Sequence, residues 1–354
     1  MKVVGIAGTA KNTGKTTTLL EAIRFFDERR KKLFITGIGY DGEDFDNLTG
    51  LPKPRVFVPE GAVVASALPL LQSSPARFDD LKDTGVRCAL GRIFLGRVTS
   101  PGRVVLAGPA STRDLASVAA LAPEDSIVLL DGAFSRISPM VVADSLILAT
   151  GAARSRDSHR IAREINAIDT IMRLPVMKDV CTGGNKVIGD GVLNVSGGLF
   201  LPGQGQELAW RLNGTRKPRT VYVAGIINPL VLLEALNEMG LNRSGGPGHV
   251  ASVSFIFDHP IMLLLSGDVL QWERVFHILY EAGLKTGVLG SMALLGATVN
   301  PYIPLRSGAG KYIATYVPPE SFLGDITNLT RVPCTDIILE GPGKLQSWLK
   351  RFLD

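Results

Sequence analysis

The chain has 354 residues, of which 45% are apolar and 20% charged, and its formal net charge is +5. This composition is typical of a globular protein with a substantial core, built as one large α/β domain or as two domains. The positive charge lies in several short basic stretches, none long enough for a nucleic-acid-binding tail, so a nucleic-acid partner is not expected.

Cysteine usage and hydropathy favour a cytoplasmic protein. Cys88, Cys181 and Cys334 are scattered and odd in number, so they indicate neither a disulfide framework nor a metal-ligand spacing. An apolar strand follows Met1-Lys2 at once, which leaves no room for a signal peptide. Residues 286–305 lack charges, but glycines, prolines and an asparagine interrupt them. We therefore expect buried loops and short elements there, with no membrane contact.

The first 26 residues predict a strand, a phosphate loop and a helix. The apolar run 3–7 gives way to a glycine- and threonine-rich stretch, and apolar residues then return at helical spacing. Gly8 and Gly14 let backbone N–H groups turn toward a polyphosphate, Lys15 supplies a cation for its β and γ oxygens, and Thr16 offers a hydroxyl to Mg²⁺. The expected ligands are thus ATP and Mg²⁺. The residues predicted to contact the nucleotide are Gly8, Thr9, Asn12, Thr13, Gly14, Lys15, Thr16 and Thr17. The alternative interpretation is a turn that binds no nucleotide.

The loop departs from the usual spacing. Gly8 and Gly14 enclose five residues instead of four, and Thr9 stands where the first glycine is usual. In this form the loop resembles that of dethiobiotin synthetases and of the cobyrinic acid diamide synthase ATP domains, members of the SIMIBI class of P-loop NTPases. The resemblance implies an α/β fold with a doubly wound, mostly parallel sheet. MinD-like members carry a further lysine where this chain has Ala10, so Lys11, one residue late, is not given that role at a dimer interface.

A second strand is expected at 33–38, after a helix that ends in the basic run 29–32. It leads into an acidic stretch with Asp41, Glu43 and Asp44. In a doubly wound sheet both strands end at one edge, so these acids would lie beside the phosphates. Asp41 is a candidate Mg²⁺ ligand, and Asp41 and Glu43 are candidate catalytic groups that orient the nucleophile. The alternative is an acidic turn held by its own backbone bonds.

The middle of the first half is predicted from local patterns alone. Residues 60–71 read as a helix with small apolar side chains, and 92–98 and 103–107 read as two strands of a hairpin around the turn 99–102. Ser111 is expected to cap a helix that continues to residue 121.

Asp131 follows Ser126 and the apolar run 127–130, which is the pattern of a buried parallel strand. An acid at the end of such a strand is the position of a Walker B carboxylate, which holds Mg²⁺ through water. Asp131 is therefore predicted to be a catalytic, metal-binding residue. A further strand is expected at 144–151 and a basic helix from 155 to 168.

Three motifs together carry a closer resemblance: the phosphate loop, the stretch 39–43, and Asp131-Gly132-Ala133 with Arg136. They resemble the P-loop small subunit of the lysine 5,6-aminomutase reactivase. This resemblance implies an ATP-dependent factor that helps to replace damaged cobalamin on a partner enzyme. The partner would be an adenosylcobalamin-dependent aminomutase or the second reactivase subunit.

Glycine-rich and breaker-rich stretches, 183–205 and 213–219, suggest a boundary between a nucleotide-binding domain, 1–214, and a second α/β domain, 215–354. In the second domain we expect strands at 220–225, 253–257, 261–265 and 311–317 and helices at 229–239, 269–282 and 345–352. The four histidines share no metal spacing.

Three functions are compatible with these patterns: an ATPase that acts on a partner protein, an enzyme of the dethiobiotin synthetase type that phosphorylates a small carboxylate, and a non-hydrolysing nucleotide-sensing scaffold. The second half shows no small-molecule catalytic signature, which favours the first. The choice between ATP and GTP has no sequence signature here, because the guanine motif Asn-Lys-x-Asp is missing. A homodimer is left open.

Overall fold

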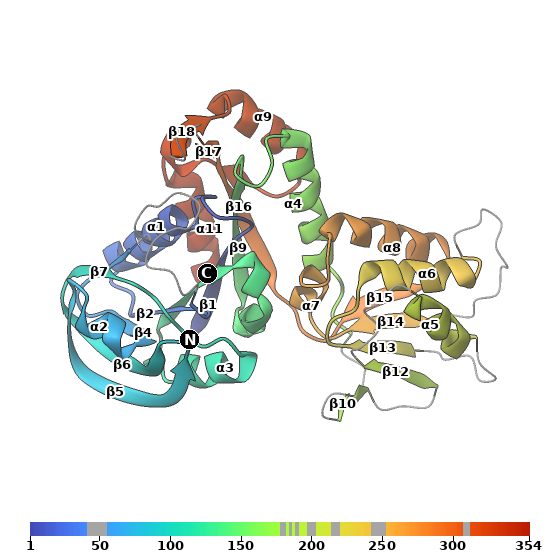
Figure 1. The fold of residues 1–354 in the computed structure, drawn as a ribbon, viewed down its shortest axis with the longest axis horizontal. Coiled ribbons are helices and arrows are strands. Elements are labelled where there is room, and N and C mark those ends of the chain that lie inside the picture. The colour runs from blue at the N-terminus through green and yellow to red at the C-terminus, as the bar shows by residue number, and fades with distance from the viewer. Residues whose placement is uncertain are drawn as a thin grey trace. The chain divides into compact units, whose positions relative to one another are not determined.

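The computed structural model describes residues 1–40, 55–177, 182–183, 186–187, 191–196, 203–213, 220–241, 253–306 and 312–354 (Figure 1). The chain divides into two compact units. Unit 1 comprises Met1–Ile165 and Ala293–Asp354, and unit 2 comprises Asn166–Met292. Unit 2 is thus inserted into unit 1. The units meet in the sequence at 165/166 and at 292/293, whereas the sequence analysis suggested a single boundary at 214/215.

Unit 1 is built on a nine-stranded sheet in the order β19-β16-β9-β1-β8-β2-β4-β6-β5. All neighbours from β19 to β4 are parallel, whereas β6 pairs antiparallel with β4 and β5. The strands are β1 (Lys2–Gly8), β2 (Leu33–Gly37), β4 (Val63–Ala67), β5 (Arg77–Cys88), β6 (Gly91–Ser100), β8 (Ile127–Ala133), β9 (Ser145–Gly151), β16 (Ala293–Asn300) and β19 (Cys334–Thr335). The predicted mostly parallel α/β sheet is confirmed.

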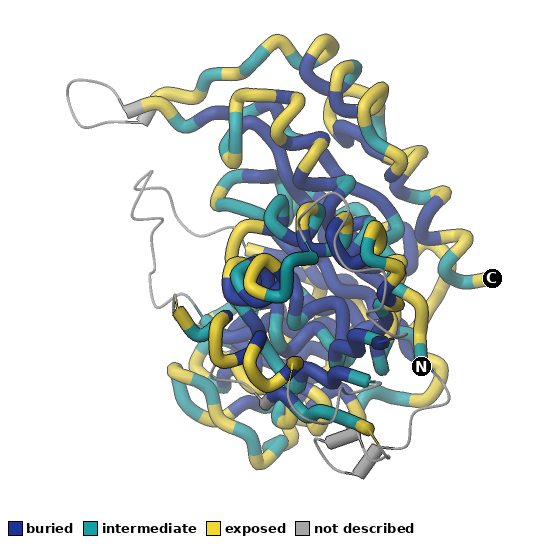
Figure 2. Tube along the Cα trace, turned by 90° about the vertical axis from the view of Figure 1, so that its right-hand side faces the viewer, coloured by how far each residue is buried: buried dark blue, intermediate teal, exposed yellow. Residues whose placement is uncertain are grey.

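The central strands read as continuous apolar runs because they are buried on both faces. On one face, α1 (Lys15–Glu28) and α11 (Gly343–Leu353) pack against β1, β8 and β9 and form the main core. On the other face of β1, the 3₁₀ helix η2 (Ser138–Val142) packs against Gly5. A Cβ added to Gly5 would lie 3.0 Å from the sulfur of Met140. Figure 2 shows the buried segments gathered in the interior.

The remaining elements of unit 1 surround this sheet. The helices are α2 (Leu68–Gln72), α3 (Thr112–Ala119), η1 (Phe134–Arg136), α9 (Pro319–Leu329) and α10 (Ile337–Glu340), together with the start of α4 (Ser158–Met172), which continues into unit 2. Two small antiparallel pairs are formed by β3 (Val56–Val58) with β7 (Gly102–Val104), and by β17 (Tyr302–Arg306) with β18 (Tyr312–Tyr316). Ser111 caps α3 by accepting a hydrogen bond from the Asp114 N–H, as predicted.

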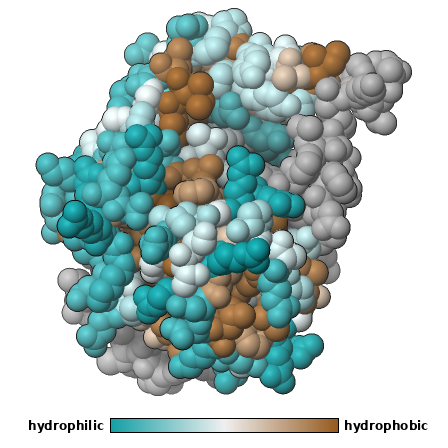
Figure 3. Space-filling model, turned by 90° about the vertical axis from the view of Figure 1, so that its left-hand side faces the viewer, coloured by the Kyte–Doolittle hydropathy of each residue, from teal (hydrophilic) through white to brown (hydrophobic). Residues whose placement is uncertain are grey.

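Two predictions in the first half are wrong. The predicted helix 60–71 is wrong over Val63–Ala67, which form strand β4 and are all buried in the sheet, and only its end is helical in α2. The predicted hairpin partner of 92–98 is also wrong, since β6 pairs with β4 and β5 while β7 pairs with β3. The edge strand β5 is rich in charged side chains, and hydrophilic residues cover much of this side of the molecule (Figure 3). Charged edges resist pairing with other chains.

Unit 2 has a smaller, all-parallel sheet in the order β12-β13-β14-β15. Its strands are β12 (Val192–Ser196), β13 (Thr220–Ala224), β14 (Ser254–Phe257) and β15 (Lys285–Val288), and a short pair is formed by β10 (Thr182–Gly183) and β11 (Lys186–Val187). Its helices are α5 (Gln204–Leu212), α6 (Pro229–Glu238), α7 (Pro260–Leu264) and α8 (Val269–Glu281). A second α/β unit was predicted and is confirmed.

The strand predicted at 261–265 is wrong, because this segment is helix α7. His259 caps it, its Nδ1 accepting a hydrogen bond from the Ile261 N–H at 3.2 Å, and Pro260 occupies the first helical position. Proline is favoured there because its fixed φ suits a helix and its missing N–H is not needed. The apolar run had suggested a strand.

Within the described residues, none of the helices combines the length and the apolar character that crossing a membrane requires.

Candidate functional site

Unit 1 contains a cavity of about 600 Å³ at the edge of the sheet where the parallel strands end. Ligands of open α/β sheets bind at this edge. The cavity is lined by residues 8–17, by the ends of β2 and β8 with the segments that follow them, and by Asn300 at the end of β16 and Tyr302. All eight residues predicted to contact a nucleotide lie in this lining.

The loop between β1 and α1 has the backbone conformation of an anion-binding turn. Asn12 and Gly14 have left-handed φ angles of 63° and 83°, which reverse the chain just before the helix begins at Lys15. The Thr13 hydroxyl donates to the Ala10 carbonyl at 2.9 Å and braces the turn. Helix N-termini and such turns present backbone N–H groups to anions. A turn of this kind before a helix N-terminus is compatible with phosphate binding.

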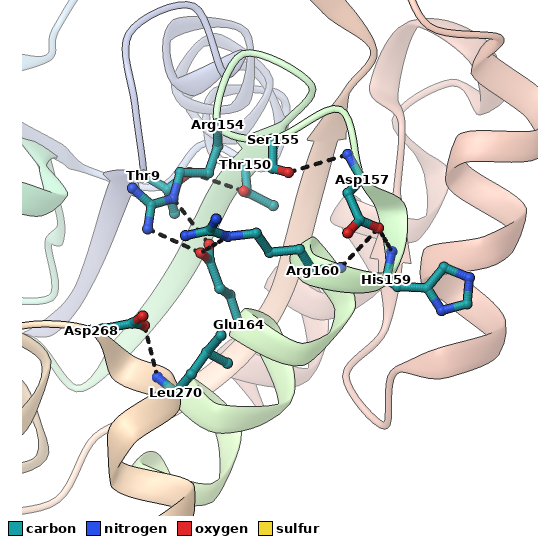
Figure 4. Close-up of polar contacts among 10 residues, drawn as sticks. All are labelled: Thr9, Thr150, Arg154, Ser155, Asp157, His159, Arg160, Glu164, Asp268 and Leu270. Carbon is teal, nitrogen blue, oxygen red and sulfur yellow. Dashed lines mark hydrogen bonds and ion pairs between the residues drawn. The ribbon is translucent and has the colours of Figure 1, made fainter.

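Thr9 is used to fix the loop to the neighbouring strand. Its hydroxyl donates to the Thr150 hydroxyl at 2.9 Å, and its N–H donates to the Ala149 carbonyl at 2.9 Å (Figure 4). Gly8 takes the crowded position, since a Cβ there would lie 3.2 Å from both the Lys15 Cδ and the Thr13 hydroxyl. The shifted glycine spacing thus leaves Thr9 free to bind β9 through its side chain.

The segment that follows β9 is also held in place. Arg154 donates two hydrogen bonds of 3.0 Å to the buried carboxylate of Glu164, and Arg160 donates a third at 3.3 Å (Figure 4). Asp157 accepts from the His159 N–H at 3.0 Å near the start of α4. Two guanidinium groups compensate the buried charge of Glu164, as a buried carboxylate requires.

Lys15 and Asp131 form an ion pair inside the cavity, the Lys15 ammonium donating a hydrogen bond to Asp131 Oδ1. Their side chains are 25% and 18% exposed. The pair exists because β1 and β8 are adjacent parallel strands, so the loop after β1 reaches the end of β8. Thr16 lies in the same lining. The structure therefore brings together the three residues predicted to hold the phosphates and the metal.

The acidic candidates after β2 lie outside the described residues, namely Asp41, Glu43 and Asp44. The segment that leads to them does line the cavity, through Gly37 to Tyr40. Gly39 has a φ of 63°, and a Cβ there would lie 3.6 Å from Arg136 Cδ. Arg136 is the last residue of η1, which follows β8 and Asp131, and it also lines the cavity.

Asn300 and Tyr302 are among the lining residues that the sequence analysis missed. The Asn300 Nδ2 donates to the Asn12 carbonyl at 2.8 Å, and its Oδ1 accepts from the Tyr302 N–H at 3.2 Å. A signal was present: β16 is a mostly apolar run that ends in a polar residue, like β8 with Asp131. The glycines and prolines around it led to an expectation of loops instead.

The donor set suits Mg²⁺ with a polyphosphate. Magnesium is usually bound by one or two protein oxygens, water and substrate phosphates, and a cage of protein ligands is uncommon. Thr16 and Asp131 supply one hydroxyl and one carboxylate, and Lys15 adds a cation beside them. The described residues contain no group of three or more His, Cys, Asp or Glu side chains that could hold a metal ion.

A scan against protein-family models and a search of curated proteins give no match. Among solved structures, the chain is similar to the MinC:MinD cell division protein complex of Aquifex aeolicus, with 12% identity, a TM-score of 0.27 and coverage of 100% of this chain and 96% of that chain. It is also similar to pNOB8 ParA bound to nonspecific DNA, with 13% identity, a TM-score of 0.30 and coverage of 99% of both chains.

These matches amount to a distant structural similarity to a MinC:MinD complex and to ParA. At such TM-scores the similarity assigns no function. Neither match is a reactivase, so that finer resemblance rests on the sequence motifs alone.

Proposed function

We propose that the chain binds ATP with Mg²⁺ in this cavity and hydrolyses it. The observation that carries the proposal is the meeting of Lys15 and Asp131, which stand 116 positions apart in two separate sequence motifs. A glycine-rich turn alone would not need a carboxylate from another strand beside its lysine. The pairing of both residues at one cavity is what a phosphate- and metal-binding site requires.

Each residue has a defined task in this proposal. The N–H groups of the loop and the first turn of α1 bind the phosphate oxygens, and Lys15 binds the β and γ oxygens. Thr16 and Asp131 would hold Mg²⁺. When bound, Mg²⁺ neutralises charge on the β- and γ-phosphate oxygens as the terminal phosphoryl group is transferred to water.

We further propose that the amide of Asn300 favours adenine over guanine. An asparagine amide has two N–H donors and two acceptor lone pairs, and one of each is used in the bonds to Asn12 and Tyr302. The remaining donor and acceptor match N7 and N6 of adenine, whereas guanine offers two acceptors on that edge. Tyr302 lies beside it in the lining and supplies an aromatic surface for the base.

The finer proposal is that hydrolysis serves a partner protein, an adenosylcobalamin-dependent aminomutase or the second reactivase subunit. Its support is the resemblance of the phosphate loop, residues 39–43 and Asp131 to Arg136 to the reactivase small subunit. This proposal expects slow basal hydrolysis that the partner accelerates, because a partner shifts a conformational equilibrium only through its different affinities for the nucleotide states.

One observation favours a second candidate, an enzyme that phosphorylates a small carboxylate. Beyond Asp131 the cavity continues to Arg136 and to an apolar wall of Val56, Val105 and Leu106. A guanidinium beside apolar side chains suits a small acid with an apolar body. Phosphoryl transfer is catalysed mainly by positioning and charge stabilisation, so such a pocket would be sufficient.

Calorimetry with Mg²⁺-ATP tests the shared part of these proposals. Lys15→Ala should abolish measurable binding without unfolding the protein, while Lys31→Ala, at an exposed lysine beyond α1, should bind as the wild type does. Unchanged ATP affinity in Lys15→Ala would reject the site.

Turnover then separates the candidates. ADP release is measured alone, with a candidate aminomutase, and with small carboxylates in the presence of hydroxylamine, which traps acyl phosphates. Acceleration by the aminomutase supports the partner ATPase, and trapped product with one carboxylate supports the enzyme. Binding without any turnover would instead indicate the nucleotide-sensing scaffold.

A further inference from the structure

Strand β16 contacts the phosphate loop and its helix through alternate residues. Alternate residues of a strand face the same side. On β16, Gly296 faces the ring of Trp348, the Thr298 hydroxyl lies 2.7 Å from the Thr18 hydroxyl, and Asn300 bonds the Asn12 carbonyl at 2.8 Å. One face of one strand thus contacts α11, then α1, then the loop.

The bond from Asn300 fixes the direction of a loop amide. In a trans peptide the C=O and the following N–H point in opposite directions. Because Asn300 holds the Asn12 carbonyl toward β16, the Thr13 N–H points away from that strand. Asn12 is also in the left-handed conformation, with a φ of 63°, which is uncommon outside glycine although asparagine adopts it more readily than most residues. The hydrogen bond from Asn300 supports this conformation.

The contact at Thr298 fixes the start of the helix. The Thr18 hydroxyl donates to the Gly14 carbonyl at 3.1 Å and also meets Thr298, and both threonines are fully or almost fully buried. A buried hydroxyl pair holds its geometry because neither partner can turn to water instead. The first turn of α1, which includes Lys15 and Thr16, is thereby held against β16.

Asn300 is itself held from two further sides. Its carbonyl accepts from the Ala152 N–H at 2.8 Å, and its Oδ1 accepts from the Tyr302 N–H. Gly151 approaches so closely that a Cβ there would lie 2.0 Å from the Asn300 carbonyl oxygen. The donor that reaches the loop is therefore fixed in place before any ligand arrives.

From these contacts we propose that Thr298 and Asn300 are positioning residues of the phosphate loop. They hold the N–H groups of the loop in position for the phosphate chain. Removing either side chain therefore weakens binding of the phosphates and not only of the base. This inference rests on the proposed binding of a polyphosphate at the loop. Preorganised donors raise affinity because less ordering is needed on binding.

The experiment uses a ligand without a base, Mg²⁺-tripolyphosphate, beside Mg²⁺-ATP. Calorimetry is run on the wild type, Asn300→Ala, Thr298→Val and Thr298→Ser, with Asn328→Ala at an exposed position of α9 as the matched control. Asn300→Ala and Thr298→Val should each bind tripolyphosphate about 3- to 10-fold more weakly, the range for one lost hydrogen bond. Thr298→Ser keeps the hydroxyl and should retain wild-type affinity.

Three outcomes are decisive. If Asn300→Ala weakens ATP but leaves tripolyphosphate unchanged, Asn300 contacts only the base and the inference is overturned. If Asn300→Ala does not fold, the comparison of Thr298→Val with Thr298→Ser decides, and equal tripolyphosphate affinity in these two variants also overturns it. If the wild type binds neither ligand, the proposed function itself fails.

Discussion

The ion pair of Lys15 with Asp131 predicts that Asp131→Asn changes ATP affinity in opposite directions with and without Mg²⁺. Without the metal, ATP must break the pair to reach Lys15, and the freed carboxylate then repels the phosphates. Asparagine removes both costs. With Mg²⁺ present, the carboxylate is a metal-binding group, and its loss weakens binding.

The size of the effect follows from the pair's surroundings. A hydrogen bond between charged groups contributes about 1.5–3 kcal/mol. Because both side chains are partly exposed, at 25% and 18%, water screens the pair and we take the lower end, about 1.5 kcal/mol. That value corresponds to about a tenfold change in affinity. Asp131→Asn should therefore bind ATP about tenfold more tightly than the wild type in EDTA.

Calorimetric titration of ATP in EDTA, and again in excess Mg²⁺, measures the change in ATP affinity under both conditions. Asp27→Asn, an exposed acid on α1, is the control for a general loss of negative charge. In a Lys15→Ala background the gain in EDTA should shrink, because no pair remains to be broken. The reasoning is refuted if Asp131→Asn binds ATP in EDTA no better than the wild type.

Three other predictions concern stability and reactivity. Gly296→Ala should lower the free energy of unfolding by about 1–3 kcal/mol in urea titrations, because its Cβ would lie 2.5 Å from the buried ring of Trp348; unchanged stability would mean that the ring can move. Burial lowers the pKa of His259 to about 4, below its unfolded value near 6.5. The unfolded chain therefore takes up the proton first, and stability should fall by up to about 3 kcal/mol as pH drops from 6.5 to 4; His259→Asn should remove this part of the pH dependence. Cys88 is partly exposed, whereas burial raises the pKa of the Cys334 thiol to about 11. A thiol reagent should thus modify Cys88 in the folded protein, with Cys334 reacting only after denaturation, as mass spectrometry of digested protein would show.

The parts of the site that could be predicted from sequence are those with local signals. The turn from Gly8 to Lys15 needs glycines at fixed positions, and β8 reads as buried because every residue before Asp131 is apolar. Parallel strands deliver such ends to one edge, so the meeting of Lys15 and Asp131 could be expected from the two motifs alone. Whether the two residues perform their proposed roles remains a prediction.

The parts that could not be predicted depend on pairing between distant segments. β16 lies beside β9 although all of unit 2 separates them in sequence, so no local pattern connects Asn300 with Asn12. Residues 99–102 suggested a hairpin turn, but β6 continues to Ser100 and β7 begins at Gly102, and turn chemistry does not specify which strand pairs with which. At 261–265 the cap at His259 outweighed the apolar pattern, because helix termini are set by single residues.

The insertion of unit 2 before β16 has a consequence for synthesis on the ribosome. Chains emerge from the N-terminus and domains tend to fold as they appear. When β9 has emerged, its neighbour β16 has not been translated, and one edge of the nascent sheet still lacks its partner strand. Unit 2 is continuous in sequence and is complete before that edge is covered. The nascent chain therefore carries the loop between β1 and α1 without its hydrogen bond from Asn300 until residue 300 has been made.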